Sequence, residues 1–269
     1  MYLHLLKIDL KKLTSYRTFW VVCGLYFVTL GFGTASGMEF LKWLARTFEK
    51  FGEENLNINR IPLYHFPDVW MNLIWVGGLL KVLLAIMVVI SVTNEFTYRT
   101  IRQNIIDGLS RFEFLLSKIL TNVLLSLMSV VMIFVIGLVT GLIYSPSVDV
   151  AQMFTDVEFF AAYFMEIFFF LSFALMLSML IQRSGLTIIL LLLSQMIEAI
   201  IKANIDDYVP AIIPYFPMQS IWDLIDLPFP RYALQEIRDY VSIPTLLIVM
   251  TWTFLFNYFS YLKLKRADI

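Results

Sequence analysis

Long apolar runs separated by short polar segments are the dominant pattern of the chain. Six runs are long enough to cross a hydrocarbon core of ~30 Å, which needs about 20 apolar residues in a helix. A strand of a membrane β-barrel alternates polar and apolar residues, whereas runs such as "LTIILLLLSQMIEAII" are apolar on all faces. The pattern predicts an all-α polytopic membrane protein with six transmembrane helices, near residues 18–37, 72–93, 114–144, 159–181, 186–203 and 243–262.

The first 17 residues form an amphipathic pattern ahead of the first run. At helical spacing, one face carries leucines and the opposite face carries basic side chains. The leucines are Leu3, Leu6, Leu10 and Leu13, and the opposite residues are His4, Lys7 and Lys11. Such a helix lies flat in the membrane interface with its lysines at anionic headgroups. The alternative interpretation is a basic flank that serves only to set the topology.

Two segments between runs are too apolar for solvated loops and are expected on the external side. Residues 38–71 begin with an amphipathic stretch at 40–51 and continue irregularly past Pro62 and Pro67. Residues 204–242 contain five prolines among aromatic side chains, which forbids one continuous helix. We therefore expect broken external helices in a re-entrant segment between the fifth and sixth runs.

Residues 94–118, "NEFTYRTIRQNIIDGLSRFEFLLSK", form a polar stretch between the second and third runs. Ile101 and Ile105 share one helical face, while Arg99 and Gln103 share another, so the spacing predicts a short two-faced helix. Gly108 is placed to end this helix. Isoleucines exposed beside arginines are side chains that a protein partner would contact. The alternative is an ordinary basic loop that obeys the topology rule.

Two sequences of the form S/T-x-x-E predict helix starts by reciprocal capping. In such a box the hydroxyl accepts a hydrogen bond from the backbone of the Glu, whose carboxylate reaches back. Ser110 with Glu113 would begin the helix of the third run, and Thr155 with Glu158 that of the fourth. The polar stretch is therefore expected to be a helix, a glycine break and a new helix start.

Composition and charge agree with a single membrane domain over residues 1–269. The chain is 59% hydrophobic and 15% charged, against about 45–50% and 25% in soluble domains. If the N-terminus lies inside, the inner side carries twelve Lys and Arg residues and five Asp and Glu residues. The outer side carries seven Lys and Arg residues and fourteen Asp and Glu residues. Basic residues in short loops stay in the cytoplasm, so both termini and residues 94–118 are expected there.

Several kinds of chemistry find no support in the sequence. No G-x-x-x-x-G-K-[ST] loop occurs, so ATP hydrolysis would need another polypeptide, and the chain is not expected to be an enzyme. His4, His65 and Cys23 are too few and too far apart for a metal cluster or a histidine-based catalytic site. The basic residues are few and close to the membrane, so we expect no nucleic-acid partner.

Three ionisable residues, Lys81, Glu166 and Glu198, lie within the apolar runs. Such residues are costly in lipid and are functional candidates by default. Glu198 has Lys202 four residues later, which is the favourable orientation for a helical pair. Lys81 and Glu166 lie at similar depths, so we expect them to pair within one chain or across a dimer.

The polar stretch resembles the segment after the second span in permease subunits of bacterial ABC-2 type transporters. The matching order is Glu95, Thr100, Ser110-Arg111, Glu113 and Lys118, and the general layout of the chain is also similar. The departure is Arg99, where that family usually has glycine. In the family the segment is a coupling helix that rests in a cleft of a separate ATPase subunit. The resemblance thus implies ATPase-coupling residues Glu95, Arg99, Thr100, Ile101, Arg102, Ile105, Gly108, Ser110, Arg111, Glu113 and Lys118.

The resemblance also implies the setting. The protein would be the permease of an ATP-driven exporter in the bacterial inner membrane, as two identical or related chains with two ATPase subunits. ATP and Mg are expected on the partner ATPase, with no cofactor in this chain. The alternative function is an ion-coupled secondary transporter or channel that uses Lys81 and Glu166, although no inverted repeat is evident. The substrate is not specified by any feature of the sequence.

Overall fold

The computed structural model describes residues 2–37, 39, 63–146, 149–206, 208–233 and 236–266, and every regular element in these ranges is helical. The amphipathic stretch expected at residues 40–51 lies outside the described residues, as does Pro62. Pro67, also expected to interrupt the external segment, lies two residues before Val69, where the helix that begins the second span starts. The expected all-α fold is confirmed for the described part of the chain.

The long helices follow the apolar runs closely. They are α2 (Arg17–Ala35), the pair α4 (Val69–Leu79) and α5 (Lys81–Thr97), α7 (Arg111–Tyr144), α9 (Glu158–Ile181), α10 (Ser184–Ile205) and α12 (Ile243–Arg266). Five of them are long and apolar enough to cross a membrane alone. The α4–α5 pair is bent by 40° and brings the number to six if it forms one span. These are the features of a multi-pass membrane protein.

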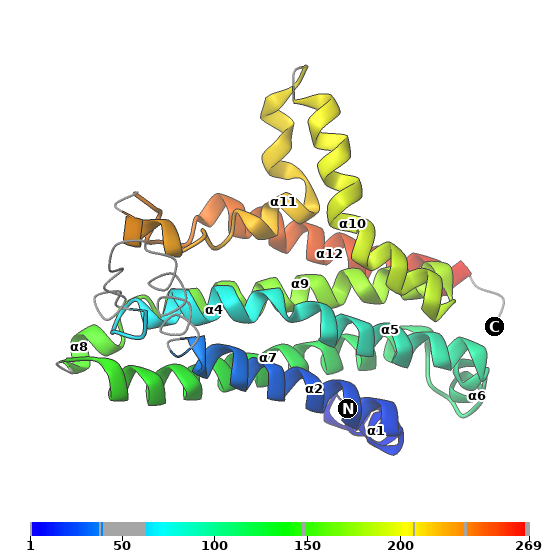
Figure 1. Ribbon diagram of the computed structural model, residues 1–269. Helices are drawn as coiled ribbons and strands as arrows, with labels where there is room; N and C mark the ends of the chain where they lie inside the picture. Colours follow the sequence, from blue (N-terminus) through cyan, green and yellow to red (C-terminus); the bar gives the residue numbers. More distant parts are fainter. Residues whose placement is uncertain are drawn as a thin grey trace, which may run out of the picture.

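The shorter helices lie at the ends of the bundle or in the segment that connects α10 to α12 (Figure 1). They are α1 (Tyr2–Ser15), α6 (Thr100–Ile106), α8 (Val150–Met153), η2 (Pro210–Tyr215), α11 (Pro217–Trp222) and η3 (Phe229–Ala233). Figure 1 shows α1, α6 and the last turns of α12 at one end of the bundle, and α8 at the other. The hydrogen bond from Arg111 to the backbone oxygen of Lys265 joins α7 to α12 at the first end. The long helices therefore alternate in direction as the apolar pattern predicts.

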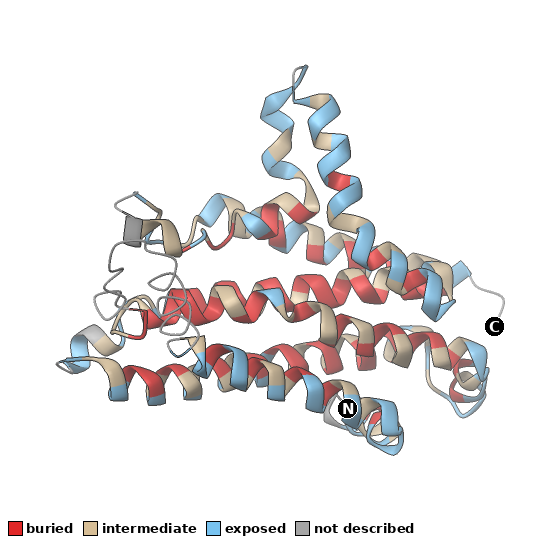
Figure 2. Ribbon diagram, viewed as in Figure 1, coloured by how far each residue is buried: buried red, intermediate tan, exposed pale blue. Residues whose placement is uncertain are grey.

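Helix α9 is the centre of the bundle and packs against α5, α7 and α12. Buried positions are concentrated on α4, α5 and α9, whereas α10 is exposed over most of its length (Figure 2). Large rings fill the interior, including Phe169 of α9 against Phe256 of α12, with ring centroids 5.2 Å apart. Aromatic pairs in this edge-to-face geometry add to the stabilisation from buried area.

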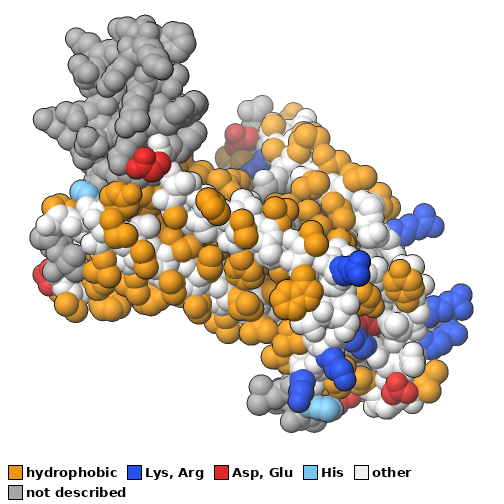
Figure 3. All heavy atoms as spheres, turned by 60° about the horizontal axis from the view of Figure 1, so that its bottom comes forward, with side chains coloured by type: hydrophobic (Ala, Val, Ile, Leu, Met, Phe, Trp, Pro, Cys, Tyr) orange, Lys and Arg blue, Asp and Glu red, His pale blue; other side chains and the backbone are white. Residues whose placement is uncertain are grey.

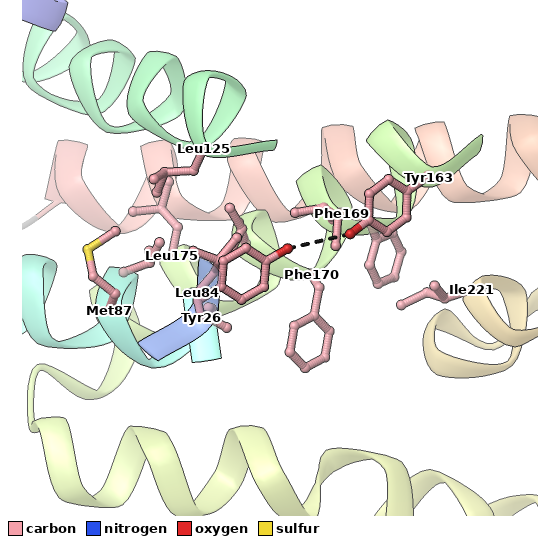
Figure 4. Packing of buried hydrophobic residues seen from close by; sticks show 14 of the residues in the cluster. Tyr26, Leu84, Met87, Leu125, Tyr163, Phe169, Phe170, Leu175 and Ile221 are labelled. Atoms are coloured by element: carbon pink, nitrogen blue, oxygen red, sulfur yellow. Dashed lines mark hydrogen bonds between the residues drawn. The ribbon is translucent and has the colours of Figure 1, made fainter. Parts of the chain in front are cut away.

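Hydroxyl groups lie inside this apolar interior. Tyr26 of α2 and Tyr163 of α9 point toward one another, with their oxygens 3.4 Å apart (Figure 4). Ser129 of α7 hydrogen-bonds to both, at 2.7 Å from the Tyr163 hydroxyl. Since buried polar groups are stable only when they are hydrogen-bonded, these contacts fix the relative position of three helices.

The segment between α10 and α12 is broken as the prolines predict. Pro210 begins η2 and Pro217 begins α11, positions where the missing N–H of proline is not needed. The far half of α10 and η2 stand away from the bundle as a hairpin-shaped arm (Figure 1). Exposed apolar side chains cover this arm, among them Ile200, Tyr208 and Ile212.

The predicted capping box at the start of α9 is wrong. The hydroxyl of Thr155 donates back to the carbonyl of Ala151, and the residue before α9 makes no side-chain cap. Asp156 adopts a left-handed conformation with φ 66°, which directs the chain into α9 without the box. The helix nevertheless begins at Glu158, so the start was located correctly although its cause was not.

Close packing of α4 on α7 depends on a glycine, and this yields the first prediction. A Cβ at Gly137 would overlap the ring of Trp70, which is fully buried. We expect Gly137→Ala to lower the free energy of unfolding by ~1–3 kcal/mol, as overpacking of a tight interior does. Thermal unfolding in detergent measures the effect.

The matched control is Gly33→Ala, where an added Cβ meets no atom within 4 Å. This variant should unfold at the wild-type temperature or slightly above it, because alanine favours helix more than glycine does. Equal melting temperatures for the two variants would contradict the packing argument.

Candidate functional site

The chain turns sharply between the second and third spans. Helix α5 continues to Thr97 and α7 begins at Arg111, so the interhelical part of the predicted stretch is shorter than residues 94–118. Between them, Arg99 has φ 54° and precedes α6, and Gly108 has φ 99° just after it. Both conformations are left-handed, which glycine adopts without strain and other residues do not. The predicted break at Gly108 is confirmed.

The backbone at Arg99 has a conformation that favours glycine. Glycine would fit this left-handed position easily, whereas a side chain there carries a conformational cost of about 1–2 kcal/mol. The arginine side chain is exposed to solvent. The backbone before α6 therefore has a conformation that suits glycine, but the residue there is an arginine with an exposed, positively charged side chain.

The capping box at Ser110 and Glu113 is confirmed. The Ser110 hydroxyl accepts from the Glu113 backbone N–H at 3.2 Å, and the Glu113 carboxylate accepts from the Ser110 N–H at 2.8 Å. Arg111 donates to the Lys265 carbonyl at 2.6 Å. These contacts set the direction of α7 and join its first turn to the end of α12.

A buried charge cluster, formed by Asp9, Lys12, Glu95 and Lys118, lies directly beneath the turn. The Lys118 ammonium lies 2.5 Å from Asp9 and 3.1 Å from Glu95, and these three side chains are 4%, 3% and 7% exposed. Lys12 lies 3.6 Å from Glu95 and is one-third exposed. With two cations and two anions, the cluster is formally neutral, which is the condition under which buried charges are tolerated.

Neighbouring polar groups complete the hydrogen bonding of the cluster. Thr121 donates to Asp9 at 2.6 Å, and the Thr100 hydroxyl donates to Glu95. Lys12 also donates to the side-chain oxygen of Asn104 in α6 at 2.8 Å. The cluster therefore connects α1, α5, α6 and α7 through side chains alone.

These positions correct part of the sequence prediction. Ile101 is 4% exposed and packs into the core, so it is not available to a partner, and Ile105 is half-buried. Glu95, Thr100 and Lys118 face inward as well, where they hold the turn in place. Arg102 and Ile106 are exposed, and the exposed fraction of Ile106 is 77%.

The face of α1 that contacts the protein also differs from the prediction. Leu5, Asp9 and Leu13 are buried, while Leu6 and Leu10 are only half-buried. His4, Lys7 and Lys11 are exposed, as expected. Because Asp9 lies midway between two leucines at intervals of four, the same face places a carboxylate inside the protein.

The expected contact between Lys81 and Glu166 is present within one chain. The ammonium and the carboxylate are 2.5 Å apart, and the two side chains are 6% and 9% exposed. Lys81 is the first residue of α5, at the bend after α4. The rings of Phe170 and Trp222 lie over the ammonium, with centroids 5.7 and 5.6 Å away.

The backbone at the bend makes room for this ion pair. A Cβ at Gly78 would lie 2.6 Å from a carboxylate oxygen of Glu166, so only glycine fits without displacing the carboxylate. The other intramembrane acid, Glu198, lies 3.9 Å from Lys202. It also accepts from the backbone N–H groups of Met218 and Gln219 at 2.8 and 2.7 Å. Glu198 thus holds the start of α11 against α10.

An ion-pair network at the opposite end of the bundle was missed by the sequence analysis. Arg231 contacts both Asp68 and Asp239. Burial raises the pKa of Asp68 above its ordinary value, and the attraction of Arg231 opposes this rise without cancelling it. Burial and the neighbouring Glu158 raise the pKa of Asp156 as well. No local sequence signal connects residues this far apart.

Among the residues that the structure describes, no group of three His, Cys, Asp or Glu side chains could hold a metal ion. Comparison with known proteins identifies one family. Its sequence profile, described as "Protein of unknown function (DUF2705)", matches residues 56–269. No curated protein matches the chain.

Substitution of Gly108 tests the turn through its backbone alone, because a Cβ there meets no atom within 4 Å. We expect Gly108→Ala to lower the free energy of unfolding by ~1–3 kcal/mol, the range for strained backbone conformations. Gly108→Val should lower it further because branched side chains are more restricted. Gly185→Ala, at an equally open position without a left-handed backbone, is the control for thermal unfolding in detergent. Equal melting temperatures for Gly108→Ala and Gly185→Ala would contradict the expected backbone strain at residue 108.

Removal of one or both members of the Lys81–Glu166 pair tests whether the pair braces the bend. Lys81→Met leaves a buried carboxylate without its cation, which typically costs ~3–5 kcal/mol, whereas replacing both charges can be nearly neutral. We therefore expect Lys81→Met to melt well below Lys81→Met with Glu166→Gln. The same loss in the single and the double variant would exclude a bracing role.

Proposed function

The chain belongs to the DUF2705 family, whose function is unknown, and from its own residues and geometry we propose that it is the permease subunit of an ATP-driven exporter. In this proposal the helical bundle crosses the bacterial inner membrane six times, with both termini in the cytoplasm. The resemblance of residues 94–118 to the coupling segment of ABC-2 permeases supports it. The concentration of Lys and Arg at the α1, α6 and α12 end agrees with the positive-inside rule (Figure 3).

The observation that carries the proposal is a small exposed surface on a rigidly held turn. We call Tyr98, Arg99, Arg102 and Ile106 the docking surface; all four are exposed, and Arg102 and Ile106 lie four residues apart on α6. Aromatic and arginine side chains with an apolar neighbour are typical of protein interfaces. An acidic, partly apolar cleft on a separate ATPase subunit would complement this surface.

The charge cluster beneath the docking surface would transmit force. Lys118 and Glu95 tie the bases of α7 and α5 together, and Asp9 adds α1. Displacement of α6 by a closing ATPase would therefore move three helices as one body. Because α5 begins at the bend that carries Lys81, this movement would reach the middle of the bundle. Two such chains, identical or related, would form the translocation path between them.

The second candidate function is an ion-coupled secondary transporter or channel. The Lys81–Glu166 contact favours it, because transporters place charged groups at interrupted helices inside the membrane. However, the two charges neutralise each other, and aromatic rings and a tight glycine enclose them. A bracing role accounts for these features without a transported ion.

Copurification with an ATPase subunit tests the leading proposal. Arg102→Glu combined with Ile106→Asp should abolish copurification, because both exposed side chains would then oppose an acidic, apolar cleft. The expected loss is at least tenfold in bound ATPase, while the permease still inserts and melts like the wild type.

The matched control is Lys7→Glu, a charge reversal at an exposed position of α1 outside the docking surface. It should leave ATPase binding unchanged. An unchanged yield of ATPase with the double variant would refute the docking surface. Ion-gradient-driven flux in vesicles that lack any ATPase would instead establish the second function.

A further inference from the structure

An apolar groove of about 660 Å³ runs along the side of the bundle between α9 and α12. Four aromatic or aliphatic residues of α12 and two residues of α9 line it. They are Trp252, Phe256, Phe259 and Leu262 from α12, and Met176 and Leu180 from α9. Leu180 and Phe259 remain 46% and 45% exposed, so the groove opens toward the lipid side of the bundle.

The groove is long enough to hold an acyl chain that spans one leaflet. Its lining on α12 runs from Trp252 to Arg266, which is about 21 Å at 1.5 Å per residue. One leaflet of a hydrocarbon core of ~30 Å is about 15 Å deep. An extended hydrocarbon chain of one leaflet therefore fits along the groove.

Two cations complete the lining at one end of the groove. Lys263 and Arg266 contribute to it at the end that also carries the docking surface. Among the described residues, neither side chain forms an ion pair. Lys and Arg side chains are the usual partners of phosphate groups, and basic residues at a membrane surface attract anionic lipids. The groove is thus apolar where acyl chains lie and cationic where headgroups lie.

We propose that the groove binds one anionic phospholipid, with an acyl chain between α9 and α12 and its phosphate at Lys263 and Arg266. The orientation in the proposed function makes this a lipid of the cytoplasmic leaflet, but the site itself follows from the shape and charge of the groove. The backbone carbonyl of Lys265, which lies between these two residues in the sequence, accepts the hydrogen bond from Arg111. A lipid bound at Lys263 and Arg266 therefore lies next to the first turn of α7.

The position of Trp252 in the groove allows a direct test. Phospholipids with bromine on the acyl chain quench the fluorescence of a tryptophan that they touch. Subtracting the emission of the Trp252→Phe variant from that of the wild type isolates the fluorescence of Trp252. Vesicles of brominated phosphatidylglycerol and brominated phosphatidylcholine with identical chains are compared over a range of mole fractions. Each basic residue at a membrane surface contributes roughly a fivefold preference for an anionic lipid. Half-quenching should therefore require about 30-fold less of the anionic lipid.

Substitution of the two cations separates the site from the general lipid environment. Lys263→Gln with Arg266→Gln should bring the two lipids to nearly equal quenching of Trp252. Lys7→Gln with Lys11→Gln, which removes two exposed cations at the same end of the protein, should keep the preference. Helical content measured by circular dichroism establishes that both variants are folded.

Two outcomes would overturn the proposal. Equal quenching by both lipids in the wild type would mean that the groove takes bulk lipid without selecting the headgroup. The absence of any quenching would mean that protein covers the groove, as in an interface with a second copy. The experiment contains no ATPase, so its failure would leave the proposed function untouched.

Discussion

The neutrality of one buried charge cluster governs the end of the bundle where α1, α5, α6 and α7 meet. Lys118 lies between Asp9 and Glu95, and all three are almost completely buried. Removing a single member would leave an uncompensated charge in the protein interior, which is far less favourable than losing an ordinary hydrogen bond. The geometry of the turn, and with it the docking surface, therefore depends on helices that are far apart in sequence.

The second buried pair imposes a similar constraint in the middle of the bundle. Lys81 and Glu166 meet where α4 bends into α5, and Gly78 leaves space for the carboxylate. Helix α5 thus carries one buried charge in its first turn and another, Glu95, in its last. A rigid helix anchored at both ends by ion pairs is suited to transmit a displacement between the turn and the bend.

Local signals in the sequence predicted what local chemistry determines. The capping box at Ser110 and the left-handed Gly108 follow from residue types a few positions apart. The contact of Lys81 with Glu166 was predictable from depth, because the helical rise places both at one level of the membrane. The inward direction of Ile101 was not predictable, since periodicity shows which residues share a face but not which face meets the protein. The partner of Lys118 on α1 depends on the same rotational choice.

The cluster also has a consequence for biosynthesis. Asp9 and Lys118 are separated by more than a hundred residues, so the amino-terminal helix must wait with an unpaired carboxylate until the third span has been synthesised. Placing that carboxylate in an apolar environment before the lysine arrives is strongly unfavourable. We therefore expect the first helix to remain at the aqueous boundary during translation and to dock only after the third span is in place.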